Sequence, residues 1–254
     1  MKQIIKIGWL FPNMFNLHGD RGNILAITAE AQRRGYAVEI EQISLDTETF
    51  NPMDFDFLFC PPGEMEHFKP VVEFLEPHKD ELSAFIEEHP MLVTGTTVSL
   101  FGQMIQRDDQ STIAGLGMLS LETTENHSVY GDDIYFSCQY NGKVMEIIGS
   151  QIQMMDIAIN EESPFGRLKY GYGNTGKTKF EGVISGKGIF TNTLGPILVC
   201  NPWLTEEIIN LIEVNKSWTA FEEHRDNALE LKSLKTKTAL IEKKETRLKK
   251  LSER

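Results

Sequence analysis

Just past its first third, this chain reads Met91-Leu92-Val93-Thr94-Gly95-Thr96-Thr97-Val98. A short apolar run ends there in an abrupt turn, and a second apolar run with helix-like spacing, residues 98–105, follows at once. This order predicts a strand, a sharp turn and a helix, the elbow on which α/β hydrolytic enzymes hold a nucleophile at a helix N-terminus. The turn consists of Gly95, Thr96 and Thr97, which are therefore candidate site residues.

Strands and helices alternate in the sequence before this elbow. The apolar patterns predict strands over residues 4–11, 36–43 and 55–60 and helices over residues 20–34 and 69–88. Strands separated by helices at this pace imply crossover connections. We therefore expect a parallel sheet that is covered by helices on both faces.

The sequence after the elbow has a different character. From about residue 119 to residue 199 it consists of short β-type runs with frequent glycine, and these predict antiparallel strands added to one side. A helix over residues 205–215 closes the globular part. The predicted fold class is α/β, with a mostly parallel sheet, added antiparallel strands and a C-terminal helical tail. Residues 1–215 are expected to form one domain, and residues 216–254 a charged helical tail.

Charge is unevenly distributed along the 254 residues. Residues 1–215 carry 14 Lys and Arg against 30 Asp and Glu, a net charge of −16, whereas residues 216–254 carry 11 against 7, a net charge of +4. An acidic body repels phosphates, so nucleic acid is not a predicted partner. The tail has two interpretations: a solvated helix packed on its own domain, or a basic docking helix for another subunit.

Several other classes of protein are not supported by the sequence. No run of about 18 uncharged apolar residues occurs, and the chain begins with a strand-like segment, so we predict no transmembrane segment and a cytoplasmic location. The three cysteines, Cys60, Cys138 and Cys200, lie far apart and lack metal-type spacing. We therefore expect reduced cysteines, no metal site and no cofactor.

The loops over residues 12–23, 61–68 and 95–98 are expected to share one edge of the sheet. In open parallel sheets the ligand crevice lies beyond the carboxyl ends of the strands, which is this edge. We expect Asp20 to cap the helix that begins there, and the amides of Asn16 and Asn23 to be available to a ligand or partner. The candidate crevice or binding residues are Asn16, Asp20, Asn23, Gly63, Gly95, Thr96 and Thr97.

One segment matches a nucleotide-binding motif in spacing alone. Residues 171–178, GYGNTGKT, have the spacing of a phosphate-binding P-loop. Such a loop binds phosphates when a strand precedes it and a helix follows it directly. The residues that follow, 179–186, are typical of a strand broken by glycines, so we predict a β-hairpin turn here.

Four segments, in this order and spacing, resemble a known family. They are the loop 12–23, Gly115-Leu116-Gly117, Tyr170-Gly171-Tyr172-Gly173-Asn174, and Gly195-Pro196-Ile197-Leu198 followed by Asn201-Pro202. Together they resemble the CobB/CobQ-like class I glutamine amidotransferases, most closely the glutaminase subunit (GatD-like) of lipid II isoglutaminyl synthase. The resemblance covers nearly the whole chain, and it implies a three-layer, flavodoxin-like α/β fold.

The resemblance implies an activity and a partner. Such subunits hydrolyse glutamine with a cysteine–histidine pair and pass the ammonia to a Mur-ligase-like (MurT-like) subunit, which amidates a peptidoglycan precursor. The family's cysteine falls on Gly95 and its histidine on Leu194. Its glycine-rich oxyanion loop corresponds to Pro61-Pro62-Gly63, and its Asn-His-Gly-Gly-Arg stretch, whose arginine holds the glutamine carboxylate, corresponds to residues 151–155, QIQMM. Two prolines in the oxyanion loop have no N–H to donate.

Three functions follow from these residues. The first is a subunit that keeps the fold and a Mur-ligase-like partner but does not hydrolyse glutamine. The second is an active amidotransferase with a displaced nucleophile, for which Cys60 is the residue to test. The sequence itself favours Cys60 as a small apolar residue at the end of a buried strand and His67 as a solvated loop residue, so we do not predict a Cys60–His67 pair. The third is a standalone protein that binds a small molecule, as in cobalamin-type metabolism. Thr96 and Thr97 are expected to serve the turn rather than to attack a substrate, because no histidine is near them in sequence.

Overall fold

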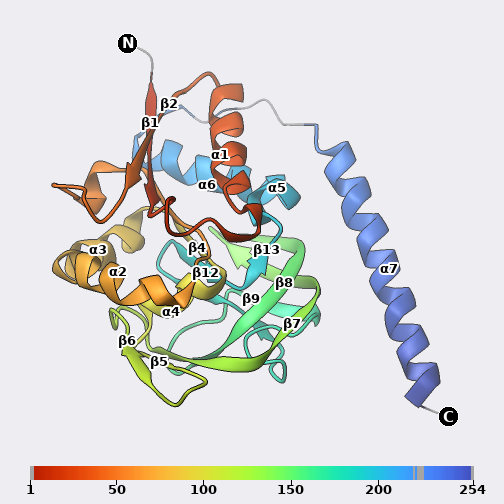
Figure 1. Cartoon of the computed structure of the whole chain (residues 1–254). Helices are drawn as coiled ribbons and strands as arrows, with labels where there is room; N and C mark the ends of the chain where they lie inside the picture. The colour runs from red at the N-terminus through yellow and green to blue at the C-terminus, as the bar shows by residue number, and fades with distance from the viewer. Residues whose placement is uncertain (1–2, 220, 222–225, 253–254) are drawn as a thin grey trace.

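A computed structural model describes residues 3–219, 221 and 226–252 of the chain (Figure 1). Its central sheet contains β1 (Ile4–Leu10), β2 (Ala37–Ile43), β3 (Phe57–Cys60), β4 (Met91–Thr94), β11 (Val183–Ser185) and β12 (Gly188–Thr191). The strand order is β11-β12-β4-β3-β1-β2, and all neighbours are parallel except β11 and β12. The predicted α/β fold with a mostly parallel sheet is confirmed.

Helices cover both faces of this sheet and make three layers. Side chains alternate along β3, so that Leu58 and Cys60 join one buried cluster, while Phe57 and Phe59 join the other. The first cluster includes apolar residues of α2 and α3, and the second includes those of α1 and α6. These helices are α1 (Gly22–Arg33), α2 (Phe68–Leu75), α3 (Lys79–Glu88) and α6 (Pro202–Asn215).

Two predicted helices differ from the structure. The helix predicted over residues 69–88 is two helices, α2 and α3, joined by a 3₁₀ turn at Glu76–His78. The turn contains Pro77, which cannot supply an N–H to a continuous helix. The helix predicted over residues 98–105 is also wrong, because α4 (Val98–Phe101) is a single turn and β5 (Met104–Gln106) follows.

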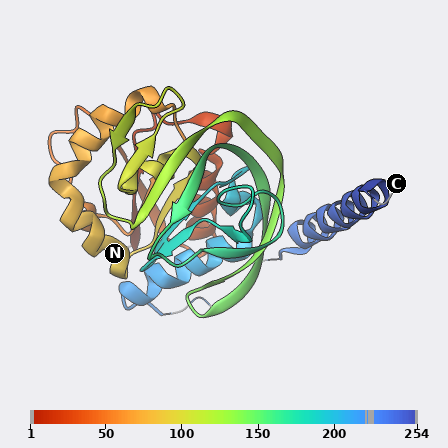
Figure 2. The same ribbon diagram turned by 90° about the horizontal axis from the view of Figure 1, so that it is seen from below.

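A second sheet contains most of the antiparallel strands that the sequence predicts. Its strands are β5, β6 (Thr112–Ala114), β7 (Leu121–Tyr140), β8 (Lys143–Ile159), β9 (Gly166–Tyr170), β10 (Phe180–Glu181) and β13 (Thr193–Leu194). The hairpin of β7 and β8 is much longer than the predicted short runs, and Figure 2 shows it curving around one side of the molecule. Two strands of this region instead join the central sheet: β12 lies parallel to β4, and β11 lies antiparallel to β12.

The P-loop-like segment, residues 171–178, lies between β9 and β10. These two strands are antiparallel neighbours, with Phe180 opposite Arg167 and Glu181 opposite Gly166. The predicted hairpin turn is confirmed. The next element after the segment is the strand β10 and not a helix, so the backbone N–H groups of residues 171–178 are not gathered at a helix N-terminus.

The chain ends in a separate helix, α7 (Ala228–Ser252), which lies beside the second sheet (Figure 1). A short helix, α5 (Ile197–Cys200), connects β13 to α6. The predicted C-terminal helical tail is thus confirmed, whereas the domain boundary at residue 215 stays a prediction. Within the described part of the chain, none of the helices combines the length and the apolar character needed to cross a bilayer.

Candidate functional site

The elbow at the end of β4 has the backbone conformation that its position requires. Thr94 ends the strand with an extended backbone, and Gly95 follows with a φ of +64°. A residue with a side chain is strained in this left-handed region, whereas glycine adopts it freely. A 3₁₀ turn at Gly95–Thr97 then leads into α4. The predicted strand–turn–helix elbow is confirmed here.

The structure brings the two implied catalytic positions together. A Cβ atom built on Gly95 would lie 3.4 Å from Cδ2 of Leu194, although the two residues are 99 positions apart in the sequence. The same Cβ atom would lie 2.8 Å from Cβ of Pro62, which is closer than real Cβ atoms approach one another. Gly95 and Leu194 are both buried, and neither carries an ionisable group. A side chain at position 95 would therefore require Pro62 or the elbow backbone to shift.

The hydroxyls of the elbow bind the neighbouring loop. The Thr96 hydroxyl donates to the carbonyl oxygen of Gly63 (2.5 Å) and accepts from the Gly63 N–H (3.2 Å). The Thr97 hydroxyl lies 3.0 Å from the carbonyl oxygen of Pro61 and 2.9 Å from that of Thr94. The only N–H in the 61–63 segment is therefore engaged by Thr96, because proline has none to offer. This segment presents no free donor to an oxyanion.

The opening loop packs on the same segment. A Cβ atom on Gly63 would lie 1.9 Å from Cδ1 of Phe15, so glycine is needed there to admit the ring. The Leu17 N–H donates to the carbonyl oxygen of Pro62 at 3.1 Å, and Phe15 is fully buried. Asn16 remains exposed, and its side chain makes no capping hydrogen bond. A binding role for Asn16 stays a prediction.

Asp20 joins three elements beneath the elbow instead of capping α1. Helix α1 begins at Gly22, and no side chain caps it. The Asp20 carboxyl accepts from the Thr94 hydroxyl and, at 3.1 Å, from the Asn23 amide. The Asn23 amide oxygen in turn accepts from the Leu198 N–H at 2.9 Å. Both Asp20 and Asn23 are fully buried, so the structure uses them to connect β4, α1 and α5.

Burial changes the ionisation of this carboxyl. The second oxygen of Asp20, Oδ1, has no hydrogen-bond partner among the described residues. Burial of a carboxylate disfavours its charged form, and it raises the pKa of Asp20 to about 7 in spite of the hydrogen bonds from Thr94 and Asn23. Burial therefore makes the Asp20 carboxyl hold its proton to a higher pH than an exposed aspartate does.

The stretch that corresponds to the family's arginine motif anchors a loop. Gln151 and Gln153 are both 1% exposed. The Gln151 side chain donates to the carbonyl oxygen of Gly173 (2.8 Å), and Gln153 donates to that of Asn174 (2.9 Å). Both side chains are therefore used inside the protein. The stretch itself offers no cation to a glutamine carboxylate.

Sequence reasoning missed a further buried carboxyl beside the elbow. Glu181 is fully buried and accepts from the hydroxyls of Thr191 (2.7 Å) and Thr193 (3.2 Å) and from the Asn192 N–H (2.8 Å). Burial raises the pKa of Glu181. Thr191 is the last residue of β12 and lies opposite Thr94, the last residue of β4, and Asn192 and Thr193 follow directly. An isolated glutamate in a glycine-rich segment gives no signal of this in the sequence.

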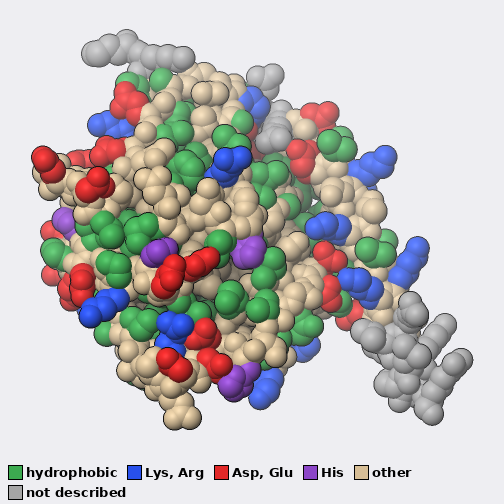
Figure 3. Space-filling view, in the orientation of Figure 1, with side chains coloured by type: hydrophobic (Ala, Val, Ile, Leu, Met, Phe, Trp, Pro, Cys, Tyr) green, Lys and Arg blue, Asp and Glu red, His purple; other side chains and the backbone are tan. Residues whose placement is uncertain are grey.

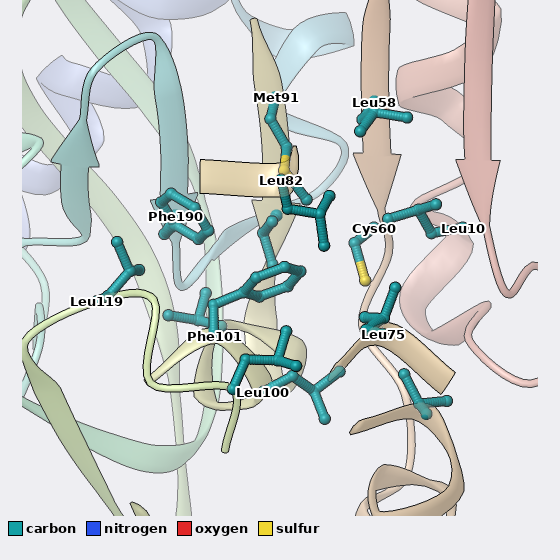
Figure 4. Close-up of a cluster of buried hydrophobic side chains, with 14 of the residues drawn as sticks. Leu10, Leu58, Cys60, Leu75, Leu82, Met91, Leu100, Phe101, Leu119 and Phe190 are labelled. Carbon is teal, nitrogen blue, oxygen red and sulfur yellow. The ribbon is translucent and has the colours of Figure 1, made fainter. Parts of the chain in front are cut away.

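Cys60 does not form a pair with His67. Cys60 is fully buried, and Figure 4 shows its sulfur among the hydrocarbon side chains of the core, close to Leu10 and Leu75. Burial raises the pKa of the Cys60 thiol to about 12. His67 lies on the surface, 3.5 Å from Glu66. Among the described residues, no hydrogen bond joins a cysteine to a histidine.

We expect Cys60 and Cys138 to resist alkylation at neutral pH in the folded chain and to react once the chain is unfolded. Both thiols are buried, and burial raises the pKa of each to about 12, so almost no thiolate is present. Iodoacetamide labelling followed by peptide mass mapping, with and without denaturant, measures this. Cys200 is less buried and should react first. Rapid labelling of Cys60 in the folded chain would contradict the assignment of Cys60 to the core.

The described residues contain no cluster of three or more histidine, cysteine or acidic side chains that could hold a metal ion.

Comparison with known proteins gives two similar sequences. Both are glutamine-hydrolysing lipid II isoglutaminyl synthase subunits GatD. The Streptococcus pneumoniae protein is 25% identical over 218 residues, which cover 81% of this chain and 79% of the relative. The Staphylococcus aureus protein is 25% identical over 197 residues, covering 76% of this chain and 78% of the relative.

A solved structure described as a glutamine amidotransferase aligns with 81% of this chain and 98% of its own length, at 14% identity and a TM-score of 0.46. No family model matches the chain. The two GatD relatives confirm the resemblance inferred from the four sequence segments: the chain is similar in sequence to GatD over about four fifths of its length.

Proposed function

We propose that this chain is a GatD-like subunit that does not hydrolyse glutamine and serves as a binding, scaffold or regulatory partner of a Mur-ligase-like amidating enzyme in cell-wall precursor modification. One observation carries the proposal. The positions implied for the nucleophile and the histidine are adjacent in the fold, but they are occupied by Gly95 and Leu194, and Pro62 packs against Gly95. The architecture of an amidotransferase elbow is present without the groups that react.

The chemistry of amide hydrolysis supports this conclusion. The reaction needs a thiolate to attack the amide carbon, a base to move the proton and N–H donors to hold the oxyanion. Glycine and leucine supply neither of the first two. The 61–63 segment supplies no free donor, because its single N–H is bound by Thr96. The burial of Cys60 and the raised pKa of its thiol argue against Cys60 as a substitute nucleophile.

The relatives support the proposed association. Each is described as a subunit of a lipid II isoglutaminyl synthase, and this chain aligns with more than three quarters of each relative. The residues around the elbow are tied by hydrogen bonds between distant segments, which keeps the surface of the domain in a defined shape without catalysis.

We expect no release of glutamate from glutamine by the purified chain, alone or mixed with the Mur-ligase-like protein proposed as its partner. Glutamate formation measured by a coupled dehydrogenase assay tests this, with the Streptococcus pneumoniae GatD relative as the positive control. We also expect the two proteins to associate at micromolar concentration in a pull-down. If the wild-type chain turned over glutamine steadily and Cys60→Ala abolished the turnover, the proposal that the chain does not hydrolyse glutamine would be wrong. If the two proteins did not associate, the proposed scaffold role would be wrong.

A further inference from the structure

Helix α7 presents two different faces, and one of them is bound to the body. Ile241 is 3% exposed and is the helix's buried apolar residue in the described range. Beside it, the Lys244 ammonium donates to Oδ1 of Asp132 at 2.8 Å and lies 3.4 Å from Oδ2 of Asp133, while Lys237 lies 3.8 Å from Asp133. The acidic body thus binds the lysines of this face.

The opposite face of α7 is exposed. This face carries an open groove of about 450 Å³ that runs along one side of α7. The lysines that line the groove are different from those that bind the body. Leu240 is 51% exposed in the middle of this groove, and no carboxylate lines it. Figure 3 shows lysine side chains spread over the outer side of the tail and acidic side chains where the tail meets the body. We call this face the lysine stripe, and its residues are Lys232, Lys235, Thr236, Ala239, Leu240 and Lys243.

The lysine stripe has the size and pattern of a helix-docking surface. Its six residues recur at intervals of three and four, so they form one continuous row along the helix. Small residues, Thr236 and Ala239, occupy its centre, which allows another helix to approach closely. In the part of the chain that the structure describes, no ion pair occupies Lys232, Lys235 or Lys243. Figure 2 shows α7 projecting from the body, and all six residues of the lysine stripe are exposed.

We propose that the lysine stripe is the docking surface for the Mur-ligase-like partner, and that it receives an acidic amphipathic helix of that protein. This inference rests on the proposed function above. Charge complementarity supports an acidic occupant, because opposite charges steer and orient association. A protein surface is favoured over a lipid surface, because Leu240 is the stripe's single large apolar side chain and membrane-binding helices insert several.

The test compares two charge reversals that change the net charge equally. The first is Lys232→Glu, Lys235→Glu, Lys243→Glu on the stripe. The matched control is Lys69→Glu, Lys177→Glu, Lys179→Glu on exposed positions of the body. Affinity for the Mur-ligase-like partner is measured by calorimetry at low and high salt, and circular dichroism checks the helical content of each variant. We expect the stripe variant to lose at least about tenfold in affinity and most of the salt dependence, and the control to stay within about twofold.

A single variant, Leu240→Ala, keeps the proposal testable if the triple variant does not fold. We expect it to weaken binding severalfold while leaving the helical content unchanged. No binding by the wild-type chain would refute the proposed function, and the inference with it. Binding that the stripe variants do not weaken, or that the control weakens equally, would overturn the inference alone. The inference would also be overturned if the stripe variant lost only its binding to anionic phospholipid vesicles, measured by sedimentation. The same holds if it lost only its self-association, measured by light scattering.

Discussion

Replacement of Gly95 by cysteine is expected to lower the free energy of unfolding by about 2–4 kcal/mol and to give no glutaminase activity. Two costs contribute to this value. A side chain at a φ of +64° is strained by about 1–2 kcal/mol, and the new Cβ atom would lie 2.8 Å from Cβ of Pro62. Leu194 at 3.4 Å narrows the remaining space. Urea denaturation of the variant and the wild type measures the difference.

Two other glycines separate these costs. Gly19 and Gly35 also have positive φ, at +70° and +87°, but a Cβ atom on either would meet no atom within 4 Å. Cysteine at either position should therefore show the backbone cost alone, about 1–2 kcal/mol. Pro62→Gly removes the clashing atom, so its combination with Gly95→Cys should destabilise less than the sum of the two single changes. Equal effects at positions 95 and 19 would show that the elbow has room for a nucleophile.

Activity gives a second readout of the same site. Even Gly95→Cys combined with Leu194→His should not hydrolyse glutamine, because the 61–63 segment still lacks a free oxyanion donor and residues 151–155 still lack an arginine. Measurable turnover in this double variant would mean that the rest of the active site is intact. The proposed loss of catalysis would then rest on two residues alone.

The elbow was predictable because its signal is local. An apolar run of strand length, a glycine and a helix-like run follow one another, and the glycine adopts the positive φ that the turn needs. The end of the following helix was not predictable from the same run. Gly102 admits Leu121 against its backbone, and the Gln103 N–H donates to the carbonyl oxygen of Leu121. A strand that begins almost twenty residues later therefore ends this helix.

The interior of the site depends on contacts between distant segments. Pro62 and Leu194 approach Gly95 only in the folded chain, and Thr94 binds Asp20 across 74 positions. From sequence alone, Asp20 before a helix predicts a cap, because that is the nearest partner for its carboxyl. The sheet instead places the end of β4 against it. Short-range patterns thus located the elbow, but they could not identify the distant residues that pack against it.

Asp20→Asn is expected to remove a pH dependence of stability that amounts to about 4 kcal/mol between pH 4 and pH 7. The pKa of Asp20 is raised from 3.8 to about 7 by burial. Over this interval the folded chain keeps a proton that the unfolded chain releases, so the wild type becomes less stable as pH rises. Asparagine has no such proton and can still accept from Thr94. The stability of the variant relative to the wild type should therefore increase from pH 4 to pH 7 and then level off.

The direction of this change distinguishes Asp20 from an ordinary surface carboxyl. Asp109 accepts hydrogen bonds from the hydroxyl and the N–H of Ser111, and these lower the pKa of Asp109. Asp109→Asn should consequently lose stability relative to the wild type as pH rises, the opposite sign. Urea titrations of the three proteins from pH 4 to pH 8 provide the comparison, and subtracting the wild-type curve cancels the contribution of Glu181 and the other carboxyls. A flat difference for Asp20→Asn would mean that the Asp20 carboxyl is hydrated in the folded chain, so that the space beneath the elbow is open to water and to a ligand.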